Sequence, residues 1–138
     1  MKTKTFLTVI LFIVLSSLVY GQTTESSNYE ISFSMVPRCG GGKDSTDIIS
    51  GKATGSDVSN LKIVIYAKGG DTWWVQPTVE NPYTKVSPSG QWQNVIHLGS
   101  VYAALLVLPT FKPVSYMTSI PQLEDGVVAI VFVNCPKK

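Results

Sequence analysis

The sequence predicts an all-β protein, an antiparallel β-sandwich of about seven short strands. Two observations lead to this fold class. Apolar residues alternate with polar ones or gather in short runs, and Gly, Pro and Asn separate these segments. No pattern with the helical period of about 3.6 residues extends beyond about two turns. Short strands divided by turn residues are typical of two packed sheets, and a closed barrel is the alternative arrangement.

The first residues have the features of an export signal. Lys2 and Lys4 precede an apolar run over residues 6–19, and the small residue Gly21 suits a cleavage site. The run is shorter than the roughly 20 apolar residues that a membrane-spanning helix needs, so a retained signal anchor is the weaker alternative.

This pattern also sets the expected domain organisation. We expect residues 1–21 to be a signal peptide, residues 22–28 a disordered leader, and residues 29–138 a single β-sandwich domain. The protein would then be exported, to the periplasm, the cell surface or the extracellular medium.

Composition and charge narrow the possible partners. Hydrophobic residues make up 44% of the chain and charged residues 14%, which excludes an intrinsically disordered protein. The chain has 11 Lys and Arg and 9 Asp and Glu, so removal of Lys2 and Lys4 leaves equal numbers of the two. Nucleic acids and anionic membranes bind clustered positive charge, and here the positive charges are scattered. We therefore expect no nucleic-acid partner and no stable membrane insertion after cleavage.

Cys39 and Cys135 are the two cysteines of the chain and lie near the two ends of the expected domain. Export would place them in an oxidising compartment, where an even number of cysteines usually forms disulfide bonds. We expect a Cys39–Cys135 disulfide, and free thiols or a metal pair are the alternatives. Closing a loop of this size stabilises a fold by up to about 4.7 kcal/mol on the chain-entropy model.

The N-terminal half of the domain contains the clearest strand patterns. Residues 29–35 alternate apolar and polar side chains, which predicts a strand whose apolar positions, Met35 included, face the core. Residues 48–55 predict a short strand. Residues 61–68 predict a longer one, with Leu61 and every second residue after it on one buried face.

The C-terminal half continues this pattern. Residues 72–76 predict a strand that ends at a proline. Residues 91–98 and 101–108 predict two strands paired around a Gly-Ser turn. Residues 126–133 are apolar on both faces, which predicts a central strand covered on both sides. Residues 109–125 contain three prolines and predict a long surface crossing with about one helical turn.

No residue pattern indicates a reaction centre. Residues 40–45 (GGGKDS) lack the spacing of a phosphate-binding loop. His97 is the only histidine, and no Gly-x-Ser-x-Gly turn or neighbouring acid accompanies it, so we expect a strand-end histidine bonded to backbone. The acidic residues considered for glycoside cleavage, which form no recognisable pair, are Asp71, Glu80, Glu124 and Asp125. We expect no enzyme activity, no bound metal and no cofactor.

Aromatic residues offer the best candidate for a binding surface, because large rigid side chains bind sugars or protein partners at a small entropic cost. Three tryptophans and a loop tyrosine form the tentative ligand-binding set: Trp73, Trp74, Tyr83 and Trp92. The alternative interpretation is that these rings are core residues that close one end of the sandwich.

Trp73 and Trp74 are consecutive strand residues, so their side chains should point to opposite faces of a sheet. We expect one of them to join the core formed by Leu61, Ile63 and Ile65, and the other to lie outside it. Trp74 is the residue that we expect to face outward.

Several segments resemble a group of poorly characterised bacterial secreted modules: 49–55 (ISGKATG), 62–66 (KIVIY), 73–77 (WWVQP), 90–92 (GQW) and 99–106 (GSVYAALL). The shared pattern is Gly-x-Val-x-Gly, a strand ending in Val-Tyr, Trp-aromatic-Val-x-Pro, Asp-Gly-x-Trp and a Tyr-Ala-Ala-Leu strand. The resemblance covers about half of the expected mature chain. One departure is Ser89 where the pattern has Asp, so a role that needs a carboxylate at this turn is in doubt.

The resemblance implies a β-sandwich of accessory or binding type, immunoglobulin-like or prealbumin-like, with no catalytic residues to carry over. Together with the residues it favours a small exported non-catalytic module that contacts a glycan or an envelope protein through an aromatic surface. A structural or assembly protein of the cell envelope, without a small-molecule ligand, is the alternative.

Overall fold

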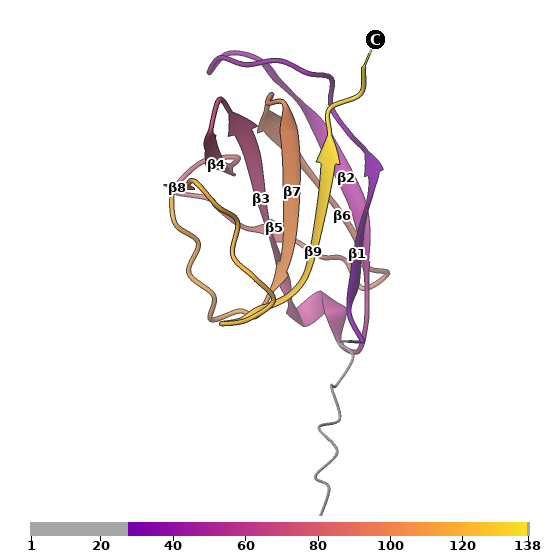
Figure 1. Cartoon of the computed structure of the whole chain (residues 1–138). Coiled ribbons are helices and arrows are strands. Elements are labelled where there is room, and N and C mark those ends of the chain that lie inside the picture. Colours follow the sequence, from indigo (N-terminus) through magenta and orange to yellow (C-terminus); the bar gives the residue numbers. More distant parts are fainter. Residues whose placement is uncertain (1–27, 138) are drawn as a thin grey trace, which may run out of the picture.

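The computed structural model describes residues 28–137, which form two antiparallel β-sheets packed face to face (Figure 1). The smaller sheet has the strand order β1-β2-β6. Its strands are β1 (Glu30–Met35), β2 (Thr46–Thr54) and β6 (Gln91–His97). The predicted all-β sandwich is therefore confirmed.

The larger sheet has the order β8-β4-β3-β7-β9, and β5 pairs with β3 at the end that β4 does not reach. Its strands are β3 (Lys62–Gly69), β4 (Thr72–Gln76), β5 (Thr84–Lys85), β7 (Val101–Val107), β8 (Tyr116–Met117) and β9 (Val127–Asn134). A short 3-10 helix, Val58–Asn60, precedes β3. Residues 109–125 contain β8 in place of the expected helical turn, so that prediction is wrong.

The structure describes the chain from Asn28 onward. The expected signal peptide and nearly all of the expected leader therefore lie outside the described residues. Within residues 28–137, no helix combines the length and the apolar character that crossing a membrane requires.

Strands β3 and β7 form the centre of the larger sheet and are buried on both faces. Every residue from Ile63 to Ala67 and from Tyr102 to Val107 is buried. Residues 126–133 were expected to be central as well. This is wrong, because β9 pairs only with β7 among the described strands and Phe132 is 54% exposed. The apolar residues of β9 are partly covered by β1 and by residues 108–126, so a two-sided apolar run does not require a central strand.

The expected pairing of residues 91–98 with 101–108 is also wrong, because β6 and β7 belong to different sheets. Between them the chain crosses from one sheet to the other at Gly99. A Cβ atom at Gly99 would lie 2.7 Å from the backbone oxygen of Lys68, so only glycine allows this close approach. The backbone N–H of Ser100 donates to that same oxygen at 2.9 Å. Gly99 and Ser100 therefore form a corner between the two sheets and not a hairpin turn.

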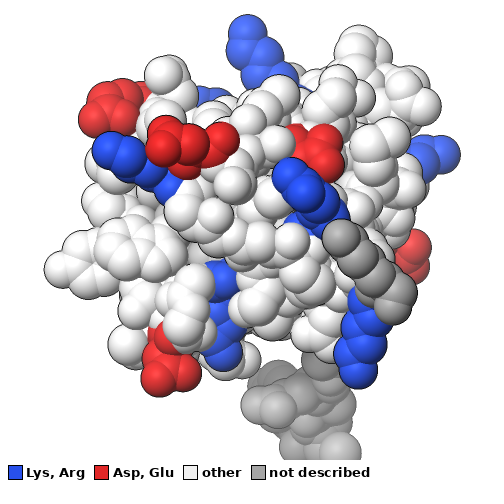
Figure 2. Space-filling view, turned by 90° about the horizontal axis from the view of Figure 1, so that it is seen from above, with Lys and Arg blue, Asp and Glu red and all other residues white. Residues whose placement is uncertain are grey.

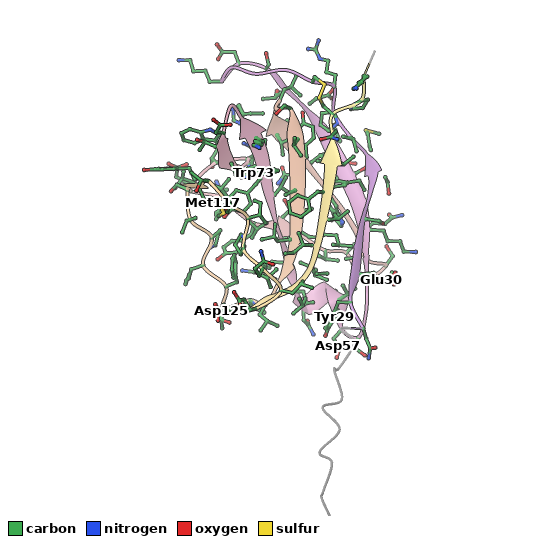
Figure 3. All side chains as sticks on the ribbon, in the orientation of Figure 1. Tyr29, Glu30, Asp57, Trp73, Met117 and Asp125 are labelled. Carbon is green, nitrogen blue, oxygen red and sulfur yellow. A yellow bond between two sulfur atoms is a disulfide. The ribbon has the colours of Figure 1, made fainter. Side chains whose placement is uncertain are left out.

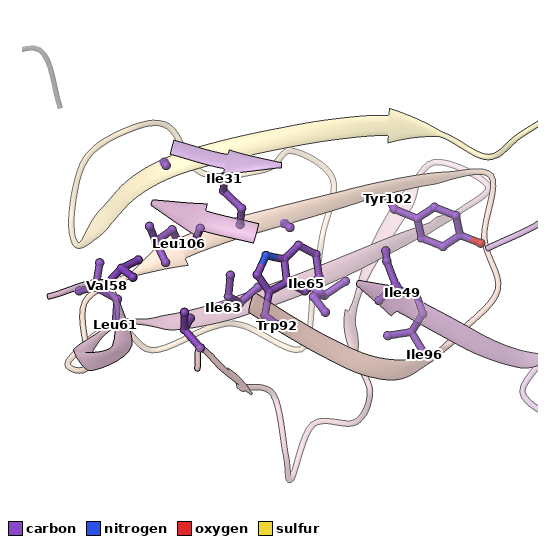
Figure 4. Packing of buried hydrophobic residues seen from close by; sticks show 14 of the residues in the cluster. Ile31, Ile49, Val58, Leu61, Ile63, Ile65, Trp92, Ile96, Tyr102 and Leu106 are labelled. Carbon is purple, nitrogen blue, oxygen red and sulfur yellow. The ribbon is translucent and has the colours of Figure 1, made fainter. Parts of the chain in front are cut away.

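The core between the two sheets contains the predicted apolar face of β3 and the indole of Trp92 (Figure 4). Trp92 is 3% exposed and lies over Gly51, where a Cβ atom would collide with the ring. Phe33 packs edge-on against it, with 5.7 Å between ring centroids. Met35 is exposed, contrary to expectation, because a register shift between Phe33 and Met35 interrupts the alternation of β1.

The outer face of the larger sheet is covered by residues 108–126, which run past β4 and β3 (Figure 1). Two tyrosines hold this segment. The Tyr66 hydroxyl donates to the backbone oxygen of Val114 at 3.0 Å, and the Tyr83 hydroxyl donates to that of Phe111 at 2.6 Å. The segment therefore takes the place of a third layer on that face, without regular structure apart from β8.

The predicted disulfide between Cys39 and Cys135 is present, with 5.0 Å between the two Cα atoms. It joins the segment after β1 to the end of β9 and so connects the two sheets. Cys39 is followed by residues 40–45, a loop that overhangs one end of the sandwich (Figure 1). The bridge anchors that loop at the residue that precedes it, Cys39.

Candidate binding cleft

The larger sheet is wider than the smaller one, and this difference leaves part of its inner face uncovered. Trp74 pairs with Ala67, and Gln76 pairs with Ile65. Directly paired residues share a face of the sheet, so both β4 side chains lie on the side that faces the smaller sheet. Within residues 28–137, no strand of the smaller sheet is paired beyond β6. A cleft of about 540 Å³ remains there, within the usual range of about 300–1,000 Å³ for ligand sites.

Several separate parts of the chain line the cleft. Its floor is formed by β4 and the end of β3. One wall consists of His97 and Leu98, where β6 ends, and the other of residues 77–80. Residues 41–43 of the loop after the disulfide contribute to the rim. Segments distant in the sequence therefore meet at this end of the sandwich.

Trp74 is the largest apolar side chain in the cleft and is 49% exposed. Beside it lies Tyr116 of β8, 63% exposed, with 5.4 Å between the ring centroids and a tilt of 39°. Val79, also exposed, lines the same cleft. Together these residues make an apolar surface with two aromatic rings, open to solvent.

Gln76 and His97 are the polar pair of the cleft. The Oε1 atom of Gln76 lies 2.9 Å from the backbone nitrogen of His97 and 3.1 Å from its Nδ1 atom. The Nε2 group of Gln76 donates to the backbone oxygen of Trp74 at 3.3 Å. Gln76 is buried, and its hydrogen bonds to His97 and to the backbone of Trp74 hold its amide in one orientation. His97 was expected to bond to backbone, and its partner is the Gln76 side chain.

Charges of both signs lie around the cleft. Lys43, at the rim, and Glu80 both line it. Lys68 also lines it, but its ammonium group lies 5.6 Å from the centre of the Trp73 ring, on the other face of the sheet. Viewed from the end of the sandwich that is uppermost in Figure 1, acidic and basic residues are interspersed (Figure 2). This end of the molecule presents no extended field of a single sign.

The structure does not bring the four predicted ligand-binding aromatics together. Trp74 lies in the cleft, and Trp92 lies in the core between the sheets. Trp73 packs on the outer face next to Met117 of β8 (Figure 3). Tyr83 is half-buried on that outer face, with the ammonium group of Lys62 4.4 Å from its ring centre.

The consecutive tryptophans do point to opposite faces, and Trp74 is the exposed one, as expected. The predicted reason is wrong in one respect. Trp73 does not join the core around Ile63 and Ile65 but a second cluster on the other face, with Val64 and Tyr66. The prediction assumed that only one face of the sheet is buried, whereas residues 108–126 bury the second face as well.

Sequence reasoning missed most of the cleft. Gln76 and His97 are 21 residues apart, and the loop at residues 41–43 was considered only as part of a phosphate-binding loop, which its spacing excludes. The one local signal was a glutamine that follows three apolar residues of the strand, just before Pro77. Such a buried amide requires polar partners, but the sequence does not indicate which ones.

The candidate catalytic groups are dispersed. Among residues 28–137, no group of three or more His, Cys, Asp or Glu side chains could hold a metal ion. Glu80 lines the cleft, whereas Asp125 lies near the opposite end of the sandwich (Figure 3). The absence of enzyme activity stays a prediction.

Comparison with known proteins finds no protein-family model that matches this chain and no curated sequence with significant similarity to it.

Proposed function

We propose that this protein is an exported, non-catalytic binding module whose ligand occupies the cleft beside Trp74. The observation that carries the proposal is the half-exposed indole of Trp74 on the inner face of the sheet. An exposed indole that shares its surface with a second exposed ring and an exposed valine is a costly arrangement for an isolated domain. A ligand bound in the cleft would cover this apolar surface and remove it from water.

The composition of the cleft supports the same conclusion. Ligand sites are typically concave and mostly apolar, with a few fixed polar groups that orient the ligand. Trp74 and Val79 supply apolar surface, and Gln76 and His97 supply hydrogen-bonding groups held in place by each other. The resemblance to bacterial secreted accessory modules agrees with a binding role, with a glycan or an envelope protein as the ligand.

Export is part of the proposal and has its own test. The disulfide is consistent with an oxidising compartment, and the first residues have the pattern of a signal peptide. The intact mass of the secreted protein should match residues 22–138, with Gln22 first. Recovery of the protein with Met1 retained, or fixed in a membrane, would show that the first residues act as an anchor.

The binding role can be tested without knowing the ligand. Labelled protein should bind to intact cells and isolated envelopes of the producing organism, and Trp74→Ala should reduce that binding by about tenfold, the equivalent of 1.4 kcal/mol. Phe132→Ala is the matched control, because Phe132 is similarly exposed but lies on β9, outside the cleft. Equal binding by Trp74→Ala and the unmodified protein would contradict the proposal and favour a structural role in the envelope.

A further inference from the structure

We propose that the ligand of the cleft is a neutral carbohydrate, with a pyranose ring against Trp74 and its hydroxyl groups at Gln76 and His97. This inference rests on the proposed binding function and specifies the class of ligand. It follows from the hydrogen-bonding state of the Gln76–His97 pair.

The orientation of the Gln76 amide is fixed by chemistry. The backbone N–H of His97 can only donate, so the amide atom 2.9 Å away must be the oxygen Oε1. The Nδ1 atom of His97 lies 3.1 Å from that same oxygen and must therefore carry a proton to form its hydrogen bond. A neutral imidazole protonated at Nδ1 has an acceptor at Nε2.

One donor and one acceptor are then left for a ligand. The Nε2 group of Gln76 has two hydrogens and uses one for the backbone oxygen of Trp74. Among residues 28–137 its second hydrogen and the Nε2 atom of His97 have no partner. Both side chains line the cleft. A hydroxyl group both donates and accepts, so a ligand rich in hydroxyls can satisfy the two sites at once.

The apolar surface selects among hydroxyl-bearing ligands. A pyranose ring has C–H groups on its faces and hydroxyls around its edge, and so combines an apolar face with a polar rim. The apolar face suits the indole of Trp74 and the ring of Tyr116, which are 5.4 Å apart between centroids. The hydroxyl edge suits Gln76 and His97. A hydrocarbon ligand would instead leave the polar pair without water or a partner, which is unfavourable.

The charges around the cleft favour a neutral sugar. Recognition of a carboxylate or phosphate relies on clustered Arg or Lys side chains, or on several aligned backbone N–H groups. Here the cleft is lined by Glu80 as well as by Lys43, and the ammonium group of Lys68 lies on the far face of the sheet. An acidic sugar would also meet the acceptor Nε2 of His97.

Affinity electrophoresis in gels containing soluble neutral polysaccharides tests the inference, with mixed-linkage β-glucan, xyloglucan, arabinoxylan and galactomannan as probes. We expect at least one of them to retard the protein. Trp74→Ala should weaken that binding by about tenfold or more, and Phe132→Ala should leave it unchanged. His97→Phe keeps a ring of similar size but removes the acceptor, and it should also weaken binding by about tenfold.

A second measurement needs no variant. Fluorescence quenching by acrylamide should report the exposed indole of Trp74, and an oligosaccharide of the retarding polysaccharide should protect it. Quenching that is unaffected by the oligosaccharide would overturn the inference even if His97→Phe failed to fold.

The outcomes separate this inference from the proposed function. If no neutral polysaccharide binds, yet attachment to cell envelopes still depends on Trp74, the ligand is a protein or another envelope component and only the carbohydrate inference fails. If a polysaccharide binds equally well to Trp74→Ala, the cleft is not the binding site and both proposals fail.

Discussion

Trp92 and Trp74 both extend from their strands into the space on the inner side of a sheet, but their surroundings differ. Trp92 is 3% exposed and Trp74 is 49% exposed. Trp92 lies where β1 and β2 meet the centre of the larger sheet, with Phe33 against its ring. Trp74 lies on β4, outside the area that the smaller sheet covers. Coverage by the opposite sheet, and not the identity of the residue, decides which tryptophan stabilises the fold.

The polar groups of the core and of the cleft also differ in their hydrogen bonding. The indole Nε1 of Trp92 is buried without a hydrogen-bond partner within the described part of the chain. At the cleft, Gln76 and His97 are bonded to each other, and both side chains line the cleft. Core residues are therefore expected to contribute mainly to stability and cleft residues mainly to binding, and each of the following experiments tests that division.

The largest difference should appear between tryptophan-to-alanine variants. Trp92→Ala should lower the free energy of unfolding by about 3–5 kcal/mol, because it leaves a cavity between the sheets. Trp73→Ala should have a similar effect on the outer face, whereas Trp74→Ala should stay within about 1 kcal/mol. Urea denaturation of the three variants measures these values. Equal and severe losses for all three would show that Trp74 is also a core residue.

A control for this series removes only the polar atom and part of the ring. Trp92→Phe loses the unpaired Nε1 group, whose burial opposes folding by about 1–3 kcal/mol. Its loss of stability should therefore be clearly smaller than that of Trp92→Ala. A loss as large as that of the alanine variant would indicate that the indole N–H has a partner in solution, such as a water molecule.

Removal of the disulfide should have the next largest effect and should reach both regions. Cys135→Ser should lower stability by about 2–5 kcal/mol. Because Cys39 anchors the loop at residues 41–43, which lines the cleft, the variant should also change the quenching of Trp74. Non-reducing peptide mapping checks the bridge itself. Free thiols titrating in the native exported protein would contradict it.

How far the sequence determined the fold can be seen in particular strands. The alternation along β3 correctly predicted that Ile63 and Ile65 face the core, because alternation reflects a local geometric rule. The pairing of β6 with β2 and of β7 with β3 was missed, because the choice of partner depends on contacts distant in the sequence. The close approach of Gly99 to Lys68, which places the corner, has no local signature.

The candidate site was predictable to a smaller extent. The exposure of Trp74 was anticipated, because the side chains of consecutive strand residues point to opposite faces of the sheet. The Gln76–His97 pair was not, because it joins strands of different sheets. The aromatic set of the sequence also included Trp92, whose burial depends on the small residue Gly51 across the strand pair.

The cover on the outer face should give a moderate effect. Tyr83→Phe and Tyr66→Phe each remove one hydrogen bond to residues 108–126 and should cost about 0.5–1.5 kcal/mol. Neither should alter binding at the cleft, which lies on the other face of the sheet. Chemical denaturation measures the first effect and affinity electrophoresis the second. A binding defect in either variant would show that the two faces are coupled.

Tyr66 adds a dependence on pH to this comparison. Burial raises the pKa of its phenol from 10.0 to about 12. Between these values the unfolded chain releases the proton while the folded protein keeps it, so stability is complete below pH 10 and declines toward pH 12. Tyr66→Phe should reduce that decline relative to the unmodified protein in denaturation experiments. An unchanged decline would mean that other groups are responsible for it.

A small change in stability is also expected for His97→Ala. His97 is partly exposed at the end of β6, and its side chain makes one hydrogen bond, to Gln76, so the variant should lose at most about 1 kcal/mol. It removes the acceptor Nε2 from the cleft, so binding should fall by about tenfold while the fold persists. Calorimetric unfolding and affinity electrophoresis on one preparation measure both quantities. A large loss of stability would make His97 a structural residue like Trp92. An enzyme activity of the purified protein that disappeared in this variant, with the fold intact, would contradict the prediction that the protein is not an enzyme.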